Sequence, residues 1–288
     1  MTYLDVAKKD FRDASRSRAL WALTALFVLF LAGFAYLGTL FLTQGSSDPS
    51  VSSLDFVTFL LGPAALLIPI TGLVISYKSI AGEVESGSAK LLLSLPHSRR
   101  DTVIGKVLGR SAVLAVSILA GLVLALIVIV ALYDEFDPVV YLVFSIFTLL
   151  FGLVYIAIGV GISATSQDSG RAMILVTGFY VLFEIIWGFV PNGVYYLLNG
   201  KFSPEYIQTP GGGVILDAPG WFFFLQRLSP SAAFNNATRA FTDSTFTIAP
   251  ALDPTPFYLS EWASVAVLLF WLLAVPAVGT YLFNRADL

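Results

Sequence analysis

Six long apolar runs constrain the fold of this chain more than any other feature of its sequence. Crossing the hydrocarbon core of a bilayer takes about 20 predominantly apolar residues in a helix. A helix also satisfies its own backbone hydrogen bonds, which lipid cannot do. We therefore expect an all-α integral membrane protein with six transmembrane helices, at residues 19–43, 56–77, 111–133, 138–167, 172–190 and 262–284.

Composition supports this class and excludes others. The chain is 57% hydrophobic and 12% charged, whereas soluble proteins carry about 25% charged residues. The sequence has no Cys and a single His, His97, which excludes a disulfide framework, a cysteine nucleophile and a multi-histidine metal site. It has no basic stripe with interleaved aromatic residues, so we expect no nucleic-acid partner. We treat residues 1–288 as a single transmembrane domain.

The distribution of positive charge predicts the orientation. Six spans place both termini on one side of the membrane, and 13 of the 16 Lys and Arg residues then fall on that side. Positive residues are retained on the cytoplasmic side. We therefore predict a multi-pass protein of the cell membrane with both termini in the cytoplasm.

Residues 2–18 form an amphipathic segment before the first span. Leu4, Ala7, Phe11 and Ala14 recur at helical spacing, and the basic residues lie on the other side. The pattern favours an interfacial helix with its basic side toward anionic lipid headgroups. An ordinary solvated helix leading into the membrane is the alternative.

The connection at residues 191–261 is the longest on the outer side. It is rich in Gly, Pro, Asn and Ser, and it contains an aromatic run at 221–228 that is too short to span. We expect either short helices resting on or dipping into the outer leaflet, or a small packed outer cap.

Residues 78–110 carry the densest mixed charge between two spans. Gly87 and Ser88 can begin a helical turn that ends at Pro96, with three leucines (Leu91, Leu92 and Leu95) on one side. Ser98 and Asp101 then have the spacing of a capping box, which predicts a helix running into the third span. Such a segment either docks a partner and transmits movement, or merely joins two spans.

Two acidic residues of this segment, Glu83 and Glu85, resemble a catalytic carboxylate pair. On a solvated surface, ion pairing with Lys78, Lys90 or the Arg99–Arg100 pair is favoured over acid–base chemistry. A third acid, Glu184, lies inside the fifth span, where an ionised side chain is costly. It is either a path or gate residue or a structural hydrogen-bonding group.

The run from Glu85 to Arg100, followed by Gly105-Lys106-Val107-Leu108-Gly109-Arg110, resembles the cytosolic segment of ABC-2 type transporter permeases. Within that family the chain is most similar to the group that includes the permease of the nitrous-oxide-reductase maturation transporter. The resemblance implies a coupling helix that docks an ABC-type ATP-binding subunit, and a working unit of two permease chains and two ATPase chains. The implied docking residues are Glu85, Gly87, Ser88, Lys90, Leu91, Leu92, Leu95, Pro96, Arg99 and Arg100.

The sequence contains no P-loop: Gly105-Lys106 and Gly200-Lys201 are followed by Val107 and Phe202 rather than by Ser or Thr. We therefore expect no catalytic activity and no cofactor in this chain, with ATP and Mg²⁺ held by the partner ATPase. The favoured function is the permease subunit of an ABC transporter, acting as an exporter. A non-transporting membrane anchor is the alternative, and an intramembrane enzyme is disfavoured because no acid–base or metal constellation lies within the spans.

Overall fold

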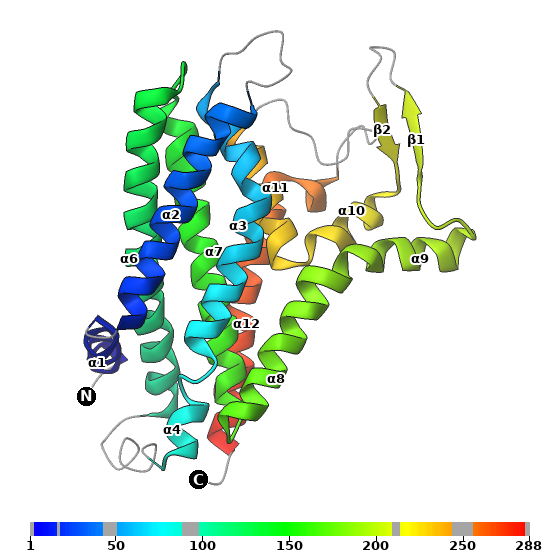
Figure 1. Ribbon diagram of the computed structural model, residues 1–288. Helices are drawn as coiled ribbons and strands as arrows, with labels where there is room; N and C mark the ends of the chain where they lie inside the picture. Colours follow the sequence, from blue (N-terminus) through cyan, green and yellow to red (C-terminus); the bar gives the residue numbers. More distant parts are fainter. Residues whose placement is uncertain are drawn as a thin grey trace.

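The computed structural model describes residues 3–15, 18–42, 51–87, 98–208, 214–243 and 256–285. These residues include six helices that are long and apolar enough to cross a membrane, which confirms the predicted all-α membrane fold. The helices form an elongated bundle, with α1 and the C-terminal end of α12 toward the same end (Figure 1). We call this the basic end, because most of the Lys and Arg residues belong to segments that lie there.

The first half of the chain builds the compact part of the bundle. A short helix lies across the bundle before the first span, and a second short helix follows the second span. The elements are α1 (Tyr3–Ser15), α2 (Arg18–Phe41), α3 (Ser53–Ser76), α4 (Ala81–Glu85), α6 (Arg99–Leu132) and α7 (Pro138–Ala164).

The second half is less regular. The fifth span, residues 169–199, comprises α8 (Ser169–Tyr180), a π-helical turn (Val181–Ile186), a 3₁₀ turn (Trp187–Phe189) and α9 (Val190–Asn199). The elements that follow are β1 (Glu205–Gln208), β2 (Val214–Asp217), α10 (Gly220–Arg227), α11 (Pro230–Thr242), a 3₁₀ turn (Phe257–Leu259) and α12 (Glu261–Arg285).

Side-chain caps set where several helices begin. Ser98 and Asp101 form the predicted capping box, so α6 begins at Arg99 and is 34 residues long. The third helix therefore extends well beyond its apolar run at 111–133, toward the basic end. Ser52 and Asp55 form a second capping box that starts α3, a pattern that we had not singled out in the sequence.

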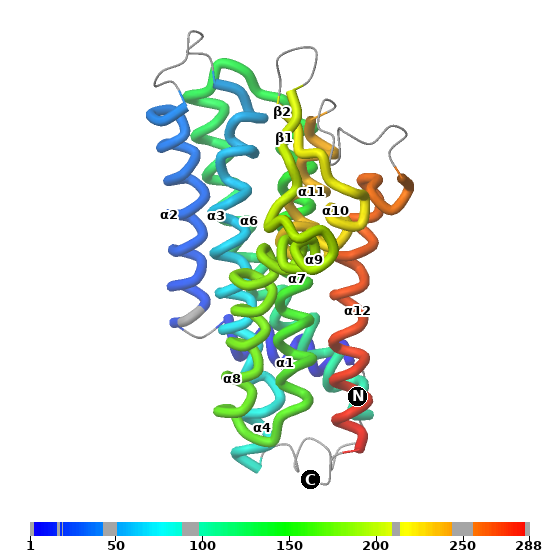
Figure 2. Tube along the Cα trace, turned by 90° about the vertical axis from the view of Figure 1, so that its right-hand side faces the viewer, coloured from blue at the N-terminus to red at the C-terminus, as the bar shows by residue number. Residues whose placement is uncertain are grey.

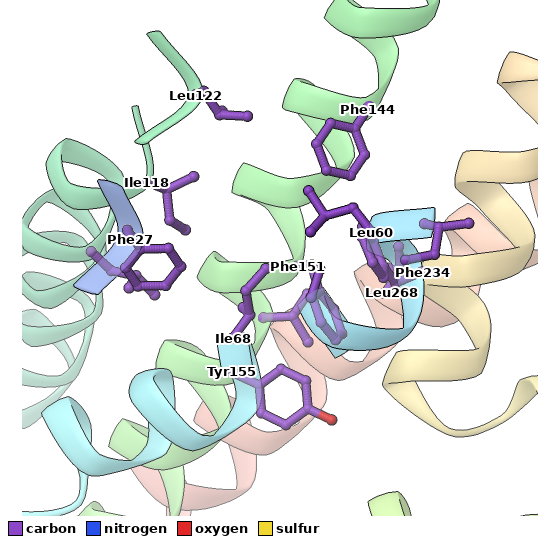
Figure 3. Packing of buried hydrophobic residues seen from close by; sticks show 14 of the residues in the cluster. Phe27, Leu60, Ile68, Ile118, Leu122, Phe144, Phe151, Tyr155, Phe234 and Leu268 are labelled. Carbon is purple, nitrogen blue, oxygen red and sulfur yellow. The ribbon is translucent and has the colours of Figure 1, made fainter. Parts of the chain in front are cut away.

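Small residues let the spans approach closely. A Cβ on Gly121 of α6 would lie 2.5 Å from the carbonyl oxygen of Phe27 on α2. Gly161 of α7 and Gly279 of α12 meet backbone to backbone, since a Cβ on Gly279 would lie 2.3 Å from the Gly161 oxygen. Such contacts are typical of helix packing in membranes. Large side chains fill the space between these crossings (Figure 3), including Phe27, Leu60, Ile118, Phe144 and Tyr155.

The described part of the connection between α9 and α12 contains short helices and a small packed cluster. Helix α11 enters the bundle core, where Phe234 stacks on Phe151 of α7 with ring centroids 4.3 Å apart. The turn into α10 and the start of α10 form a separate small cluster with Leu259, made of Ala218, Phe222 and Phe223. The antiparallel β1–β2 hairpin was not expected, because neither four-residue strand has a buried face that would leave an alternating pattern.

Candidate functional site

An ion cluster joins three elements near the basic end of the bundle. Lys106 of α6 lies with its Nζ 3.0 Å from Oδ1 of Asp10 on α1 and 2.5 Å from Oε1 of Glu83 on α4. The Nε of Arg110 lies 2.9 Å from Oδ2 of Asp10. The side chains of Lys106 and Asp10 are 7% and 5% exposed. We use the term ion cluster for these four residues, Asp10, Glu83, Lys106 and Arg110.

The ion cluster is balanced, with two acids and two bases. Removing one member of a buried pair leaves the other charge without a counterion, at a cost of about 3–5 kcal/mol. Lys106 is the central member because it contacts both acids, one from each side. Its burial therefore depends on α1 and α4 being in place together.

Two glycines allow α1 to lie against α6. A Cβ on Gly105 would be 2.6 Å from the Val6 Cβ and 2.7 Å from the Tyr3 carbonyl oxygen. A Cβ on Gly109 would be 2.8 Å from the Asp10 Cβ. The Gly105–Gly109 spacing is the small-xxx-small pattern of close helix contacts. It brings the short Asp10 side chain within reach of Lys106.

The turn between α3 and α4 is tied to α7. The backbone amides of Ile80 and Ala81 donate to Ser163 Oγ at 3.1 and 3.0 Å. The same hydroxyl donates to the carbonyl oxygen of Tyr77 at 2.6 Å. One buried serine thus holds the chain as it leaves the second span.

Glu85 connects α4 to the beginning of α8. Its Oε2 accepts a hydrogen bond from the backbone amide of Ser169 at 3.1 Å. Hydrogen bonds from the Ser169 side chain and backbone hold the pKa of Glu85 below its ordinary value. Residues 77–85 therefore contact the first turn of α8 as well as α6 and α7.

A second polar site lies in the irregular part of the fifth span. Glu184 is half-buried in the π-helical turn, and the fully buried Tyr155 of α7 donates its hydroxyl to Glu184 Oε1. Ser231, on α11, also faces this carboxylate. π-Helical turns often occur at functional sites because they offset the side chains that follow. Here the turn directs an acid toward its own bundle.

Comparison with known proteins identifies the family. The family model for ABC-2 family transporter proteins matches residues 4–288. The chain belongs to the ABC-2 transporter family. It is also similar to two proteins named probable ABC transporter permease protein NosY. The one from Stutzerimonas stutzeri is 29% identical over 208 residues, covering 70% of this chain and 74% of that protein. The one from Pseudomonas aeruginosa is 29% identical over 206 residues, with the same coverage.

These matches confirm the resemblance, and they show that the chain is an ABC transporter permease subunit. Such permeases belong to a transporter that also has an ATP-binding partner. Glu83 and Glu85 precede residues 88–97, the central part of the segment that the resemblance assigns to docking that partner, and Lys106 and Arg110 follow it.

Four of the ten docking residues predicted for this ABC-2 permease lie in described parts of the chain. Glu85 and Gly87 lie exposed at the end of α4. Arg99 donates to the carbonyl oxygen of Phe283 and lies over its ring, 5.2 Å from the centroid, while Arg100 beside it is exposed. The others lie outside the described residues: Ser88, Lys90, Leu91, Leu92, Leu95 and Pro96. The docking role of all ten residues stays a prediction.

The structure gives Glu83 a basic partner that the sequence did not indicate. This partner is Lys106, whereas Lys90, one of the expected partners, lies outside the described residues. Lys106 was overlooked because the sequence does not reveal that α1 packs across α6 and encloses this lysine. The GxxxG spacing at 105–109 was the available signal.

The structure adds a buried contact to the expected N-terminal helix. Its buried residues are Val6 and Asp10, whereas Leu4 of the expected apolar side is 49% exposed. Lys8, Lys9 and Arg12 are exposed, as expected for a basic surface. The helix of this permease is held to the bundle by a buried carboxylate.

Proposed function

We propose that ATP-binding chains dock on residues 78–110 at the basic end, and that the ion cluster carries their movement to α1 and α6. In this proposal the basic end and both termini face the cytoplasm. ATP and Mg²⁺ are held by the docked ATPase chains, and the permease works with a second permease chain as an exporter.

The observation that carries this proposal is the position of Lys106. It contacts Asp10 of α1 and Glu83 of α4, which lies just before residues 88–97. Lys106 itself lies in α6, which begins just after residues 88–97. A force applied to residues 88–97 therefore acts on both ends of the segment, and the ion cluster joins these ends to each other and to α1.

The apolar fifth span supports the pairing with a second permease chain. Large side chains along the fifth span are exposed in the single chain, among them Ile174 of α8, Phe189 of the 3₁₀ turn and Leu197 of α9. Glu184 lies between these two helices. Its role as a path or gate residue is part of this proposal.

The test is hydrogen–deuterium exchange on the assembled complex, with and without ATP and vanadate, which needs no knowledge of the substrate. In the native complex, nucleotide should change exchange in both 78–87 and α1. The double variant Asp10→Asn/Lys106→Met removes the link without leaving the Asp10–Lys106 pair half-charged. In this double variant, nucleotide should still change the hydrogen–deuterium exchange of residues 78–87, and most of the change in α1 should be lost.

Two further variants make the result specific. Lys201→Met removes the lysine of an exposed pair with Glu205 in the outer segment and should behave as native. Leu92→Asp/Leu95→Asp should abolish co-purification with the ATP-binding subunit. Transmission through the ion cluster is refuted if nucleotide leaves α1 unchanged in the native complex, or if the double variant responds fully. Undiminished co-purification of the leucine variant would refute docking on this segment.

A further inference from the structure

A groove of about 520 Å³ lies between α6, α7 and α12 in the half of the bundle nearer the basic end. Its walls are aliphatic over most of their length, including Val107, Leu108, Leu153, Leu272 and Leu273. Figure 2 shows α12 reaching the basic end, where Arg99 joins the start of α6 to Phe283. No element of the described chain covers this groove from outside.

The groove has a charged end and an apolar end. Arg100 lies in the first turn of α6, and Leu108 lies eight residues further along the helix, about 12 Å away at 1.5 Å per residue. Polarity changes in the same direction along α12, where Thr280 lies nearer the basic end than the apolar Leu272. Polarity therefore falls along the groove from the basic end toward the middle of the bundle.

Arg100 is the charged group that lines the groove. Thr280 donates its hydroxyl proton to the Pro276 carbonyl oxygen at 2.7 Å. The neighbouring Arg99 is occupied by Phe283. Arg100 forms no ion pair with any other described residue, and its side chain is exposed. A guanidinium beside an apolar groove calls for a ligand with an anionic head and an apolar tail.

We propose that this groove binds an anionic phospholipid, with its phosphate on Arg100 and one acyl chain along α6 and α12. Arginine binds phosphate oxygens through two parallel hydrogen bonds. Basic pockets between transmembrane helices are suited to anionic headgroups. This inference assigns Arg100, one of the docking residues implied by the resemblance, to lipid rather than to the ATPase, and it leaves docking of the ATPase on residues 88–97 unaffected.

The test is competitive lipid binding. Delipidated protein is equilibrated in detergent with equal amounts of phosphatidylglycerol and phosphatidylcholine, and retained lipid is counted by native mass spectrometry. The native protein should retain phosphatidylglycerol preferentially. Arg100→Gln should reduce that preference about fivefold, the contribution of one basic residue at a membrane surface. Arg171→Gln, which changes an exposed arginine in the first turn of α8, should leave it unchanged.

A second pair of variants tests the groove itself. Ala277 lines the groove, and Ala277→Phe should reduce retention of both lipids by filling the space. Its neighbour Val278 is exposed but does not line the groove, so Val278→Phe should retain lipid as the native protein does. Equal losses in the two arginine variants would overturn the proposal, as would full lipid retention by Ala277→Phe. Loss of the ATP-binding subunit with unchanged lipid preference in Arg100→Gln would assign this residue to docking instead.

Discussion

Arg227 is a buried cation that the structure uses as a hydrogen-bond donor. Its side chain is fully buried, and its guanidinium donates to the carbonyl oxygens of Tyr258, Leu259 and Ser260 at 2.8–3.0 Å. Burial lowers the pKa of Arg227 to about 10, so the group remains protonated at neutral pH. Because these carbonyls immediately precede α12, Arg227 sets where the last span begins.

Replacing Arg227 should therefore destabilise the fold. Arg227→Gln leaves at least one buried carbonyl without a donor, and each such loss costs about 1–3 kcal/mol. We expect a lower midpoint of thermal unfolding in detergent. The midpoint of Arg227→Lys should fall between those of the native protein and Arg227→Gln, since a lysine keeps the charge but lacks the planar guanidinium. The matched control is Arg171→Gln, an exposed arginine, and equal midpoints for the two glutamine variants would contradict this role.

Among the elements, the contact between α1 and α6 is the one on which the ion cluster depends. The buried lysine and the two glycines lie on one face of α6, within one turn of each other. The helix crossing and the charges are therefore coupled. Separating the helices would expose Lys106 to water, where its charge no longer requires Asp10 as a counterion.

Gly105→Leu should displace α1, because its side chain would occupy the space of Val6 and the Tyr3 carbonyl. The measurement is trypsin cleavage after the exposed Lys8 and Lys9, which we expect to accelerate about tenfold for each 1.4 kcal/mol of lost docking. Gly33 of α2 has open space at its Cβ position, so Gly33→Leu should leave the cleavage rate unchanged. Unaltered cleavage in Gly105→Leu would mean that α1 is held elsewhere.

The sequence predicted what depends on local pattern. The spans follow from apolar length, and the start of α6 follows from the Ser98–Asp101 spacing. The sequence did not predict the contacts between segments that lie far apart along the chain. The Glu83–Lys106 pair, the burial of Asp10 and the Tyr155–Glu184 contact each join residues at least 23 positions apart. The break in the fifth span was missed as well, because π and 3₁₀ turns use the same apolar residues as an α-helix.

At the scale of the whole molecule, the described helices place the ion cluster and the β1–β2 hairpin toward opposite ends of the bundle (Figure 1). Membrane orientation can be tested directly because the native chain has no cysteine. Lys9→Cys and Lys201→Cys place single thiols at exposed positions toward the two ends.

A membrane-impermeant maleimide applied to intact cells should label Lys201→Cys and not Lys9→Cys, since positive residues are retained in the cytoplasm. Permeabilised cells should show labelling of both, and the cysteine-free native chain provides the blank. The reverse labelling in intact cells would place the basic end outside the cell. Residues 78–110 could then not dock ATPase chains that use ATP from the cytoplasm.

The exposure of the fifth span predicts where substitutions can inactivate the protein without lowering its abundance. Only Ala172, Val176 and Pro191 are buried in α8 and α9. Most substitutions in these helices therefore remove few contacts within the folded chain. Surface substitutions of this kind usually change the free energy of unfolding by no more than about 0.5 kcal/mol. Substitutions in α3 or α7, whose residues fill the core, should instead lower the amount of protein in the cell. A screen for inactive variants of normal abundance should therefore concentrate in α8 and α9, and its hits would map the surface on which the assembled transporter depends.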